Sequence, residues 1–161
     1  MNRFAAPDPQ LTQSIAPNRA RSDWHARAVE LEALVADLRR SLVALQASEE
    51  RYRTAFRFSP NAITITRLAD GRYLDVNDGF TRAYGWLRDD VIGRTTAEVG
   101  IWKNPADRQA LVDLLRRDGY CDNFEAALMT RDGRELAVTV SAHQLMVGSE
   151  SCLLAITHDV T

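Results

Sequence analysis

The side chains that could do chemistry in this 161-residue chain are few and scattered. It has two cysteines, Cys121 and Cys152, in no CxxC pattern, and three histidines, His25, His143 and His158. Thiolates and imidazoles act as metal ligands, haem ligands or nucleophiles, but each role needs partners at a fixed spacing. The sequence contains no GxSxG, HExxH or P-loop motif and no cysteine–histidine cluster. We therefore expect no enzyme active site, no metal site, and two reduced thiols rather than a disulfide.

The acidic residues provide no acid–base catalyst either. The adjacent pairs Glu49-Glu50 and Asp89-Asp90 are the nearest thing to paired carboxylates. Both fall at predicted helix starts or on an exposed helical face, where solvation or the helix dipole explains them. Across the chain, 20 basic residues against 22 acidic ones leave a net charge of −2. We therefore expect neither nucleic acid nor a membrane surface as a partner.

The composition is that of a globular, cytoplasmic protein. Hydrophobic residues make up 45% and charged residues 26% of the chain, close to the average. No apolar run approaches the roughly 20 residues that span a bilayer, and the N-terminal residues MNRFAAPDPQ lack the apolar stretch of a secretory signal. The length suits one domain of ordinary size with an appendage.

The appendage is predicted to consist of a tail and a long helix. Residues 1–22 contain three of the five prolines and show no apolar periodicity, so we expect a disordered tail. Residues 23–47 lie in a stretch without glycine or proline, for which Ser22 or Asp23 can serve as the N-cap. This stretch is predicted to be a coiled-coil helix.

An apolar seam follows this helix with alternating spacings of four and three residues. Its a positions hold Ala28, Val35 and Leu42, and its d positions hold mainly leucine. A small or β-branched residue at a with leucine at d favours a parallel two-stranded coil. The alternative is a helix folded back on its own domain, but at about 1.5 Å per residue it is longer than a domain of this size can cover. We therefore predict a homodimer. The seam residues are Trp24, Ala28, Leu31, Val35, Leu38, Leu42 and Leu45.

Residues 48–161 combine short strands and short helices in a definite order. Two strands come first, then a helical cluster in which Asn77 is an N-cap, then a helix at 105–118 that begins after Asn104 and ends at Gly119. Three strands complete the domain. The predicted strands are 62–67, 72–76, 121–130, 135–146 and 151–157, with turns at Gly71, Asp132-Gly133 and Gly148.

This order of elements resembles the PAS sensor domain of bacterial sensory-box proteins, and four segments carry the resemblance. They cover the initial helix and first strand, the second strand with the short helices, the long hairpin, and an Asp-Ile-Thr type of ending in which Val160 replaces isoleucine. The segments are SEERYRTAFRFSPNAITI at 48–65, YLDVNDGFTRAYGWLRDDVIGR at 73–94, RDGRELAVTVSA at 131–142 and HDVT at 158–161.

The resemblance implies an α+β fold over residues 48–161, with a five-stranded antiparallel sheet and short helices on one face. It implies a signal-sensing and relay domain of the histidine kinase or cyclic-di-nucleotide enzyme type, with the signal leaving through Asp159 and Thr161. We expect Asp159 to hydrogen-bond or ion-pair near this exit, with an arginine such as Arg131 or Arg134. Any catalytic output domain would lie beyond residue 161, and we expect the chain to be an N-terminal fragment of a longer protein.

The resemblance also indicates which cofactors to consider. Flavin domains of the light-oxygen-voltage type carry a reactive cysteine in a GxNCRFLQ-like segment, and the matching residues 92–102 have none. Haem commonly needs a histidine on the helix over the sheet, but helix 105–118 has none, which leaves His143 if it points inward. Trp86 and Trp102 lie where they could cover a non-covalent flavin, but the favoured interpretation is that they fill the core or its rim. The prediction is no cofactor, with flavin as an alternative and haem disfavoured.

The remaining candidate site is an apolar pocket on the inner face of the sheet. Its mostly aliphatic lining suits a fatty or aromatic metabolite rather than a dicarboxylate, unless its own side chains fill it. Strand alternation offers two candidate faces, and the sequence does not decide which one turns inward. The rival interpretation is a ligandless PAS module for protein interaction. The predicted pocket residues are Ile65, Phe80, Tyr84, Trp102, Leu111, Leu115, Phe124, Val138, Val140, Leu154 and Ile156.

Overall fold

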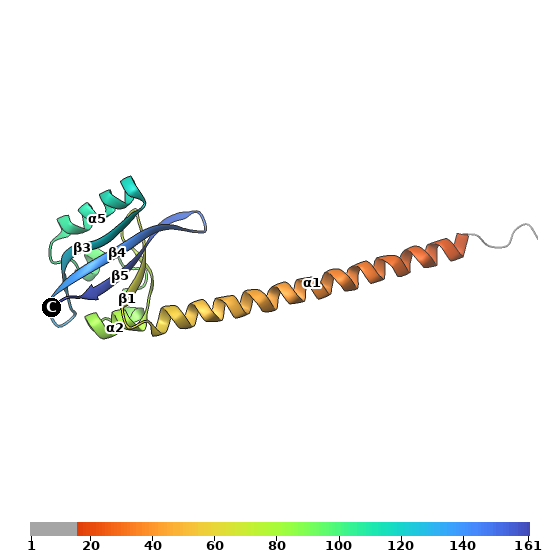
Figure 1. Cartoon of the computed structure of the whole chain (residues 1–161), viewed down its shortest axis with the longest axis horizontal. Coiled ribbons are helices and arrows are strands. Elements are labelled where there is room, and N and C mark those ends of the chain that lie inside the picture. The colour runs from red at the N-terminus through yellow and green to blue at the C-terminus, as the bar shows by residue number, and fades with distance from the viewer. Residues whose placement is uncertain (1–15) are drawn as a thin grey trace, which may run out of the picture. The chain divides into compact units, whose positions relative to one another are not determined.

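The computed structural model of the chain describes residues 16–161, with side chains from residue 21 onward (Figure 1). The predicted tail, residues 1–22, lies outside this range except for residues 16–22, which are helical rather than disordered. Pro17 stands in the first helical turn, where a missing backbone N–H costs no hydrogen bond. The long helix therefore begins earlier than the sequence indicated.

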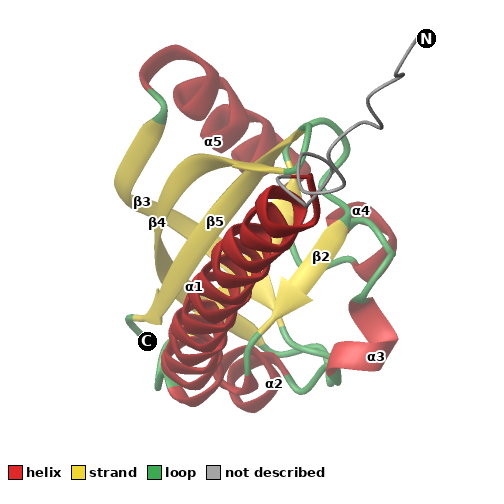
Figure 2. Cartoon of the chain, turned by 90° about the vertical axis from the view of Figure 1, so that its right-hand side faces the viewer, coloured by secondary structure: helices red, strands yellow, loops and turns green. Residues whose placement is uncertain are grey.

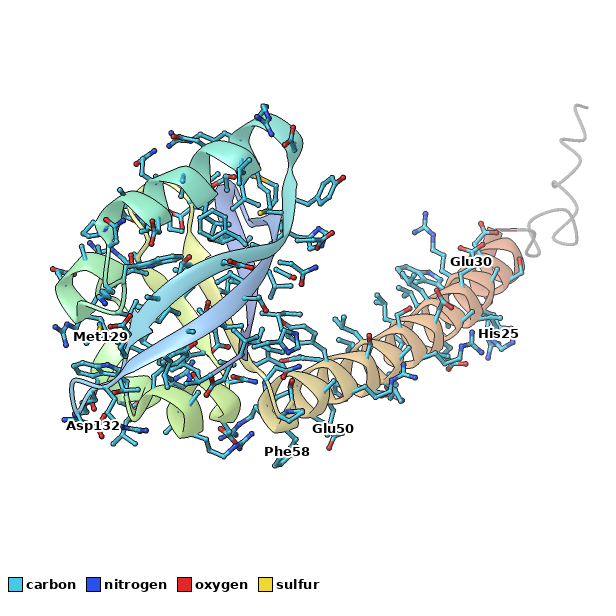
Figure 3. The ribbon with its side chains drawn as sticks, turned by 60° about the vertical axis from the view of Figure 1, so that its left-hand side comes forward. His25, Glu30, Glu50, Phe58, Met129 and Asp132 are labelled. Atoms are coloured by element: carbon cyan, nitrogen blue, oxygen red, sulfur yellow. The ribbon has the colours of Figure 1, made fainter. Side chains whose placement is uncertain are left out.

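Helix α1 (Ala16–Phe58) is 43 residues long, and the chain divides into two compact units within it, between Glu49 and Glu50. In the first unit every side chain described is exposed, and Figure 3 shows these side chains projecting around the helix at His25 and Glu30. In the second unit the end of the helix joins a folded domain, because Phe56 is buried.

The domain of the second unit is built on a five-stranded sheet in which all neighbouring strands are antiparallel (Figure 2). Its strand order is β2-β1-β5-β4-β3, so the first and last strands of the chain lie side by side in its centre. The strands are β1 (Ala62–Arg67), β2 (Tyr73–Val76), β3 (Tyr120–Met129), β4 (Glu135–Val147) and β5 (Glu150–Asp159). This arrangement confirms the predicted fold class.

Four helices connect β2 to β3. They are α2 (Asp78–Tyr84), α3 (Arg88–Val91), α4 (Thr96–Val99) and α5 (Pro105–Asp118). Side-chain caps fix where three of them, α2, α4 and α5, begin. Asn77 caps α2 by accepting a hydrogen bond from the backbone N–H of Phe80, and Asn104 caps α5 with Pro105 in its first turn. Helix α2 contacts β1, and α5 contacts β3 and β4.

The core lies between these helices and one face of the sheet, here called the inner face. On β4 this face carries Val138, Val140 and Ala142, which are almost completely buried. Cross-strand register then assigns Ala155 and Thr157 of β5 to the same face, because they pair with Ala142 and Val140. No helix in the described part of the chain combines the length and the apolar character needed to cross a membrane.

Candidate ligand pocket and its link to the first helix

A cavity of about 40 Å³ lies against the inner face of the sheet. A single water needs about 10–15 Å³ on this scale, so the cavity has room for a few small groups. All five strands contribute residues to its wall, and so do the helices α2, α4 and α5. The lining residues are Thr64, Thr66, Tyr73, Phe80, Tyr84, Thr96, Ile101, Trp102, Arg108, Leu111, Leu128, Val140, Leu153, Ala155 and Thr157.

Three aromatic rings form one connected wall of the cavity. The ring of Phe80 is completely buried and lies between Tyr73 and Tyr84, with ring centroids 5.7 Å and 5.2 Å away, both in tilted arrangements. Such contacts stabilise a core beyond the area that the rings bury. Burial raises the pKa of Tyr84 to about 12, a shift that the neighbouring Thr157 side chain partly offsets.

The other end of the cavity is polar. Arg108, on α5, is half-buried and lies against Gly71, because a Cβ placed on Gly71 would be 2.5 Å from the Nη2 atom of Arg108. Thr96 donates its backbone N–H to the Gly71 carbonyl oxygen at 3.0 Å, while its own hydroxyl is buried without a hydrogen-bond partner among the described residues. Burial raises the pKa of Tyr73 far above its ordinary value, and the Arg108 charge opposes that shift.

The structure brings part of the predicted pocket together. Phe80, Tyr84, Trp102, Leu111 and Val140 line the cavity. Among the other predicted residues, Leu115 and Val138 are buried in the same core, and Phe124 is half-buried against it. These three side chains support the cavity wall without reaching it.

Ile65, Leu154 and Ile156 were wrongly assigned to the pocket. Ile65 pairs with Leu154, and both lie on the sheet face opposite Thr64, Thr66 and the other cavity residues. Ile156 follows the same alternation along β5. The outer face of the central strands is therefore as apolar in type as the inner one, so hydrophobicity could not distinguish the two faces.

The polar lining was missed, although one signal for it was present in the sequence. Arg108 stands three positions before Leu111 and seven before Leu115, on the face of α5 that these buried leucines define. Helical periodicity could thus have placed an arginine over the sheet. Thr64 and Thr66 carry no such signal, because a strand that alternates isoleucine and threonine can turn either face inward.

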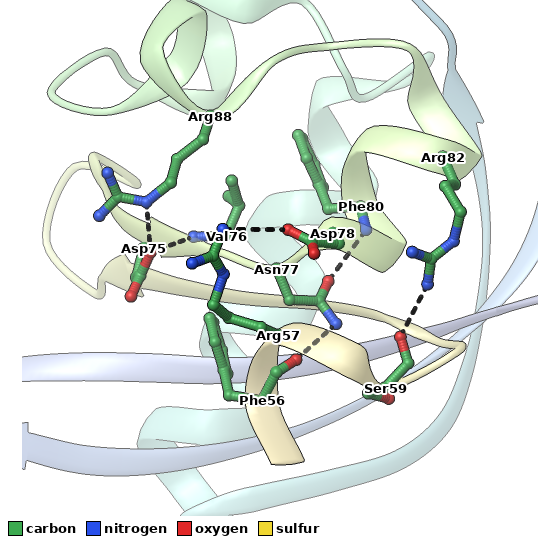
Figure 4. Close-up of polar contacts among 10 residues, drawn as sticks. All are labelled: Phe56, Arg57, Ser59, Asp75, Val76, Asn77, Asp78, Phe80, Arg82 and Arg88. Carbon is green, nitrogen blue, oxygen red and sulfur yellow. Dashed lines mark hydrogen bonds and ion pairs between the residues drawn. The ribbon is translucent and has the colours of Figure 1, made fainter. Parts of the chain in front are cut away.

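Asn77 connects the cavity helix α2 with the end of α1 (Figure 4). Its side chain is 1% exposed and makes four hydrogen bonds. The amide nitrogen donates to the carbonyl oxygens of Phe56 at 3.0 Å and Asn61 at 2.9 Å. The amide oxygen accepts from the N–H groups of Ile63 at 2.8 Å and Phe80 at 2.9 Å. One side chain therefore fixes α1, β1 and α2 to each other.

Two further contacts reinforce this junction. Arg82 of α2 donates to the Ser59 carbonyl oxygen at 3.0 Å, just beyond the end of α1 (Figure 4). Arg57 lies 3.9 Å from the carboxylate of Asp78. Both pairs are exposed, and such pairs contribute little to stability on their own. Asn77 is thus the central residue of the junction.

At the C-terminal end of β5, Asp159 is bonded to Thr161 and not to an arginine. Its carboxylate accepts hydrogen bonds from both the N–H and the hydroxyl of Thr161, and these bonds lower the pKa of Asp159. The expected partners are engaged elsewhere: Arg131 pairs with Asp90 at 2.8 Å and Arg134 with Asp132 at 2.9 Å. The charge of Arg134 also lowers the pKa of Asp159, but the hydrogen bonds of Asp159 go to Thr161 and not to the arginine that the sequence indicated.

The predicted seam residues on α1 are all exposed. Trp24 is 68% exposed, Leu31 60% and Leu45 64%, and the remaining seam positions Ala28, Val35, Leu38 and Leu42 are exposed as well. Within the single chain they pack against nothing that would bury them.

The cysteines and histidines do not form a reactive centre. Burial raises the pKa of both Cys121 and Cys152, which keeps these thiols protonated. His143 is exposed and stacks on Tyr120 with ring centroids 5.9 Å apart, so it does not point into the cavity. Among residues 21–161, no group of histidine, cysteine and acidic side chains is arranged to hold a metal ion.

With this geometry in place, the chain can be assigned to a family. Residues 60–161 match the PAS domain family, and the chain belongs to it. A PAS domain of an HTR-like protein from Haloarcula marismortui is 26% identical, with a TM-score of 0.64, over 76% of this chain and 99% of that one.

Two further solved structures show the range of proteins that share the fold. A domain of a sensory box sensor histidine kinase/response regulator from Geobacter sulfurreducens is 28% identical, with a TM-score of 0.58, over 71% of this chain and 96% of that one. The LOV domain of a blue-light activated histidine kinase from Erythrobacter litoralis is 20% identical, with a TM-score of 0.52, over 63% and 97%. The last similarity concerns the fold alone.

Proposed function

We propose that this chain is the sensing and relay domain of a bacterial signalling protein, with a small ligand bound in the inner-face cavity. The observation that carries the proposal is the position of Asn77. Its amide oxygen holds the N-terminus of α2, whose Phe80 lines the cavity, and its amide nitrogen holds the carbonyl oxygen of Phe56 on α1. A ligand that displaces Phe80 would therefore alter a hydrogen-bonded connection to α1.

The second part of the proposal is that α1 dimerises through its seam. A row of exposed leucines at a and d positions is unfavourable in water, and a parallel two-stranded coil would bury it. Two chains held this way give the relay a defined output, because a shift at the Asn77 junction would reach both helices of the coil. A ligand produces such a shift only if it binds two arrangements of the domain with different affinity.

Strand β5 offers a second route for the signal. Leu153, Ala155 and Thr157 line the cavity, and the same strand ends at Asp159, which holds Thr161. We propose that this end passes the signal to an output domain of the kinase or cyclic-di-nucleotide type. The chain itself is proposed to be non-catalytic and cytoplasmic, with any enzymatic activity in that output domain.

The sequence also left open a flavin-binding redox sensor and a ligandless interaction module, and the size and lining of the cavity argue against each of them. A flavin-binding redox sensor would need space for a three-ring system, and about 40 Å³ is far below that. A ligandless interaction module would need a cavity that stays closed. The unpartnered Thr96 hydroxyl in the cavity wall favours a ligand, because a closed core rarely leaves a buried polar group unsatisfied.

The test uses the purified full chain. An absorbance spectrum and mass spectrometry of a denatured extract identify any bound molecule, and a thermal-shift screen covers small alcohols, amides and carboxylates. We expect a colourless protein whose melting temperature rises with a member of this panel. Hydrogen exchange with that compound should then change in α2 and in residues 50–58 together. If no compound binds, the ligandless module is the better description.

A further inference from the structure

The polar end of the cavity contains a cation without a close counter-ion. Arg108 is half-buried and forms no hydrogen bond or ion pair within the described part of the chain. Asp70 is the carboxylate that interacts electrostatically with Arg108, but it already lies 3.5 Å from both Arg67 and Arg72. Burial accordingly lowers the pKa of Arg108. A guanidinium group remains charged even so, and it would gain from an anion at this point.

Six hydroxyl-bearing residues line the cavity with this guanidinium, and two of them, Thr96 and Tyr73, are its candidate partners in binding a ligand. Thr96 is 6% exposed, and its Oγ1 atom has no hydrogen-bond partner in the part of the chain that the structure describes. Tyr73 is 2% exposed, and burial keeps its hydroxyl protonated and therefore able to donate. Thr96 and Arg108 meet at Gly71, because the Thr96 backbone N–H bonds to the Gly71 carbonyl oxygen and Arg108 lies against the same glycine. Tyr73 lines the same cavity and interacts electrostatically with Arg108.

We infer that Arg108, Thr96 and Tyr73 form a subsite for the carboxylate of a small monocarboxylic acid with a short apolar body. A guanidinium and two hydroxyl donors match the charge and the lone pairs of one carboxylate. None of the described residues that line the cavity is acidic, so nothing there repels an anion. Phe80, Leu111 and Val140 would contact the apolar body.

The arrangement also selects against other anions. A dicarboxylate or a phosphate dianion would bring a second charge into a cavity with only one cation in its described wall, and an unpaired buried charge is strongly unfavourable. The volume of about 40 Å³ restricts the apolar body to a short chain. The inference replaces the larger apolar ligand expected from the sequence, and it rests on the proposed ligand-sensing function.

The test titrates the full chain with acetate, propionate and butyrate at constant ionic strength and follows amide chemical shifts by NMR. Butyramide and 1-butanol serve as neutral analogues of the same shape. We expect carboxylates to bind at least tenfold more tightly than the neutral compounds, because a hydrogen bond to a charged group contributes more than a neutral one. Binding of the neutral compounds alone would overturn the inference while leaving ligand sensing intact. Binding of none would overturn both.

Two substitutions locate the subsite. Arg108→Gln should weaken butyrate binding about tenfold to a hundredfold, whereas Arg117→Gln, an exposed position on the same helix, should leave it unchanged. Thr96→Val should weaken butyrate binding and at the same time raise the melting temperature of the ligand-free protein, because it removes an unsatisfied buried hydroxyl. Equal butyrate affinity in these variants would overturn the assignment. If Arg108→Gln does not fold, Thr96→Val and the neutral analogues decide it.

Discussion

The side-chain amide of Asn77 donates a hydrogen bond to the backbone carbonyl oxygen of Phe56 at 3.0 Å, across 21 positions of the chain. The oxygen of the same amide group caps α2 by accepting a hydrogen bond from the Phe80 backbone N–H. A residue chosen locally as an N-cap thus also connects the long helix with the sheet domain. Loss of this side chain would leave several buried backbone groups without partners at once.

We expect Asn77→Ala to lower the free energy of unfolding by roughly 3–5 kcal/mol, because it removes an N-cap and leaves buried donors and acceptors unsatisfied. Asn104→Ala is the matched control, since Asn104 also caps a helix through its side chain but is exposed. It should cost about 1 kcal/mol. Urea unfolding followed by circular dichroism measures both. Equal losses in the two variants would show that the additional Asn77 bonds contribute nothing.

The seam on α1 predicts the oligomeric state. Replacing Leu31 and Leu38 by Asp should convert a dimer into a monomer, because both d positions would place charges inside the coil. The double variant Val29→Asp, Val43→Asp is the control: these residues are 54% and 64% exposed but lie outside the seam. Light scattering coupled to size-exclusion chromatography gives the mass of each. A wild-type monomer, or a dimer that survives the leucine substitutions, contradicts the coiled coil.

Phe80 is predicted to be the most important apolar side chain of the cavity wall. It is 0% exposed, so Phe80→Ala should destabilise the domain by about 3–5 kcal/mol and enlarge the cavity. Phe58→Ala, at a position 71% exposed, should change stability by no more than about 0.5 kcal/mol. Denaturant unfolding compares the two, and benzene should bind only to the Phe80 variant. Failure to bind benzene would mean that the cavity collapses when the ring is removed.

Tyr84 predicts how stability changes at alkaline pH. Its pKa is raised from 10.0 to about 12 in the folded chain, so folding favours its protonated form. The associated stability is complete below pH 10 and is lost as the pH rises toward 12, with a loss of about 1.4 kcal/mol at pH 11. Unfolding measured between pH 8 and 11 should show this slope. The slope should become smaller in Tyr84→Phe and stay unchanged in Tyr120→Phe, an exposed control.

Much of the fold could be predicted because local signals agreed with each other. Asn77 and Asn104 mark helix starts, and Asp132 with Gly133 marks the turn between β3 and β4, where Figure 3 shows Asp132. Each signal depends on the backbone within a few residues and needs no knowledge of the tertiary structure. The order of elements then restricted the topology to a known fold.

The pocket was harder to predict, because its composition depends on which face of the sheet turns inward. Ile65 and Thr66 are neighbours in sequence, and the apolar residue was expected to face the core. The structure buries Thr66 instead, at 4% exposure. A β-branched hydroxyl residue suits a strand as well as isoleucine does, so strand propensity carries no information about the face. The inward face of β1 is determined by its pairing with β5, in which Thr66 is opposite Leu153 of the cavity wall.

The four hydrogen bonds of Asn77 have a consequence for how the sequence can vary. All four partner atoms belong to the main chain, at Phe56, Asn61, Ile63 and Phe80. The side chains at those positions can therefore be exchanged without breaking the connection, within the limits of packing. Position 77 has no such freedom, because it must supply a donor and an acceptor on one short planar group. In a saturation-mutagenesis library, tolerance should be lower at position 77 than at Asn61 and Ile63, whose side chains take no part in the bonds and are not fully buried.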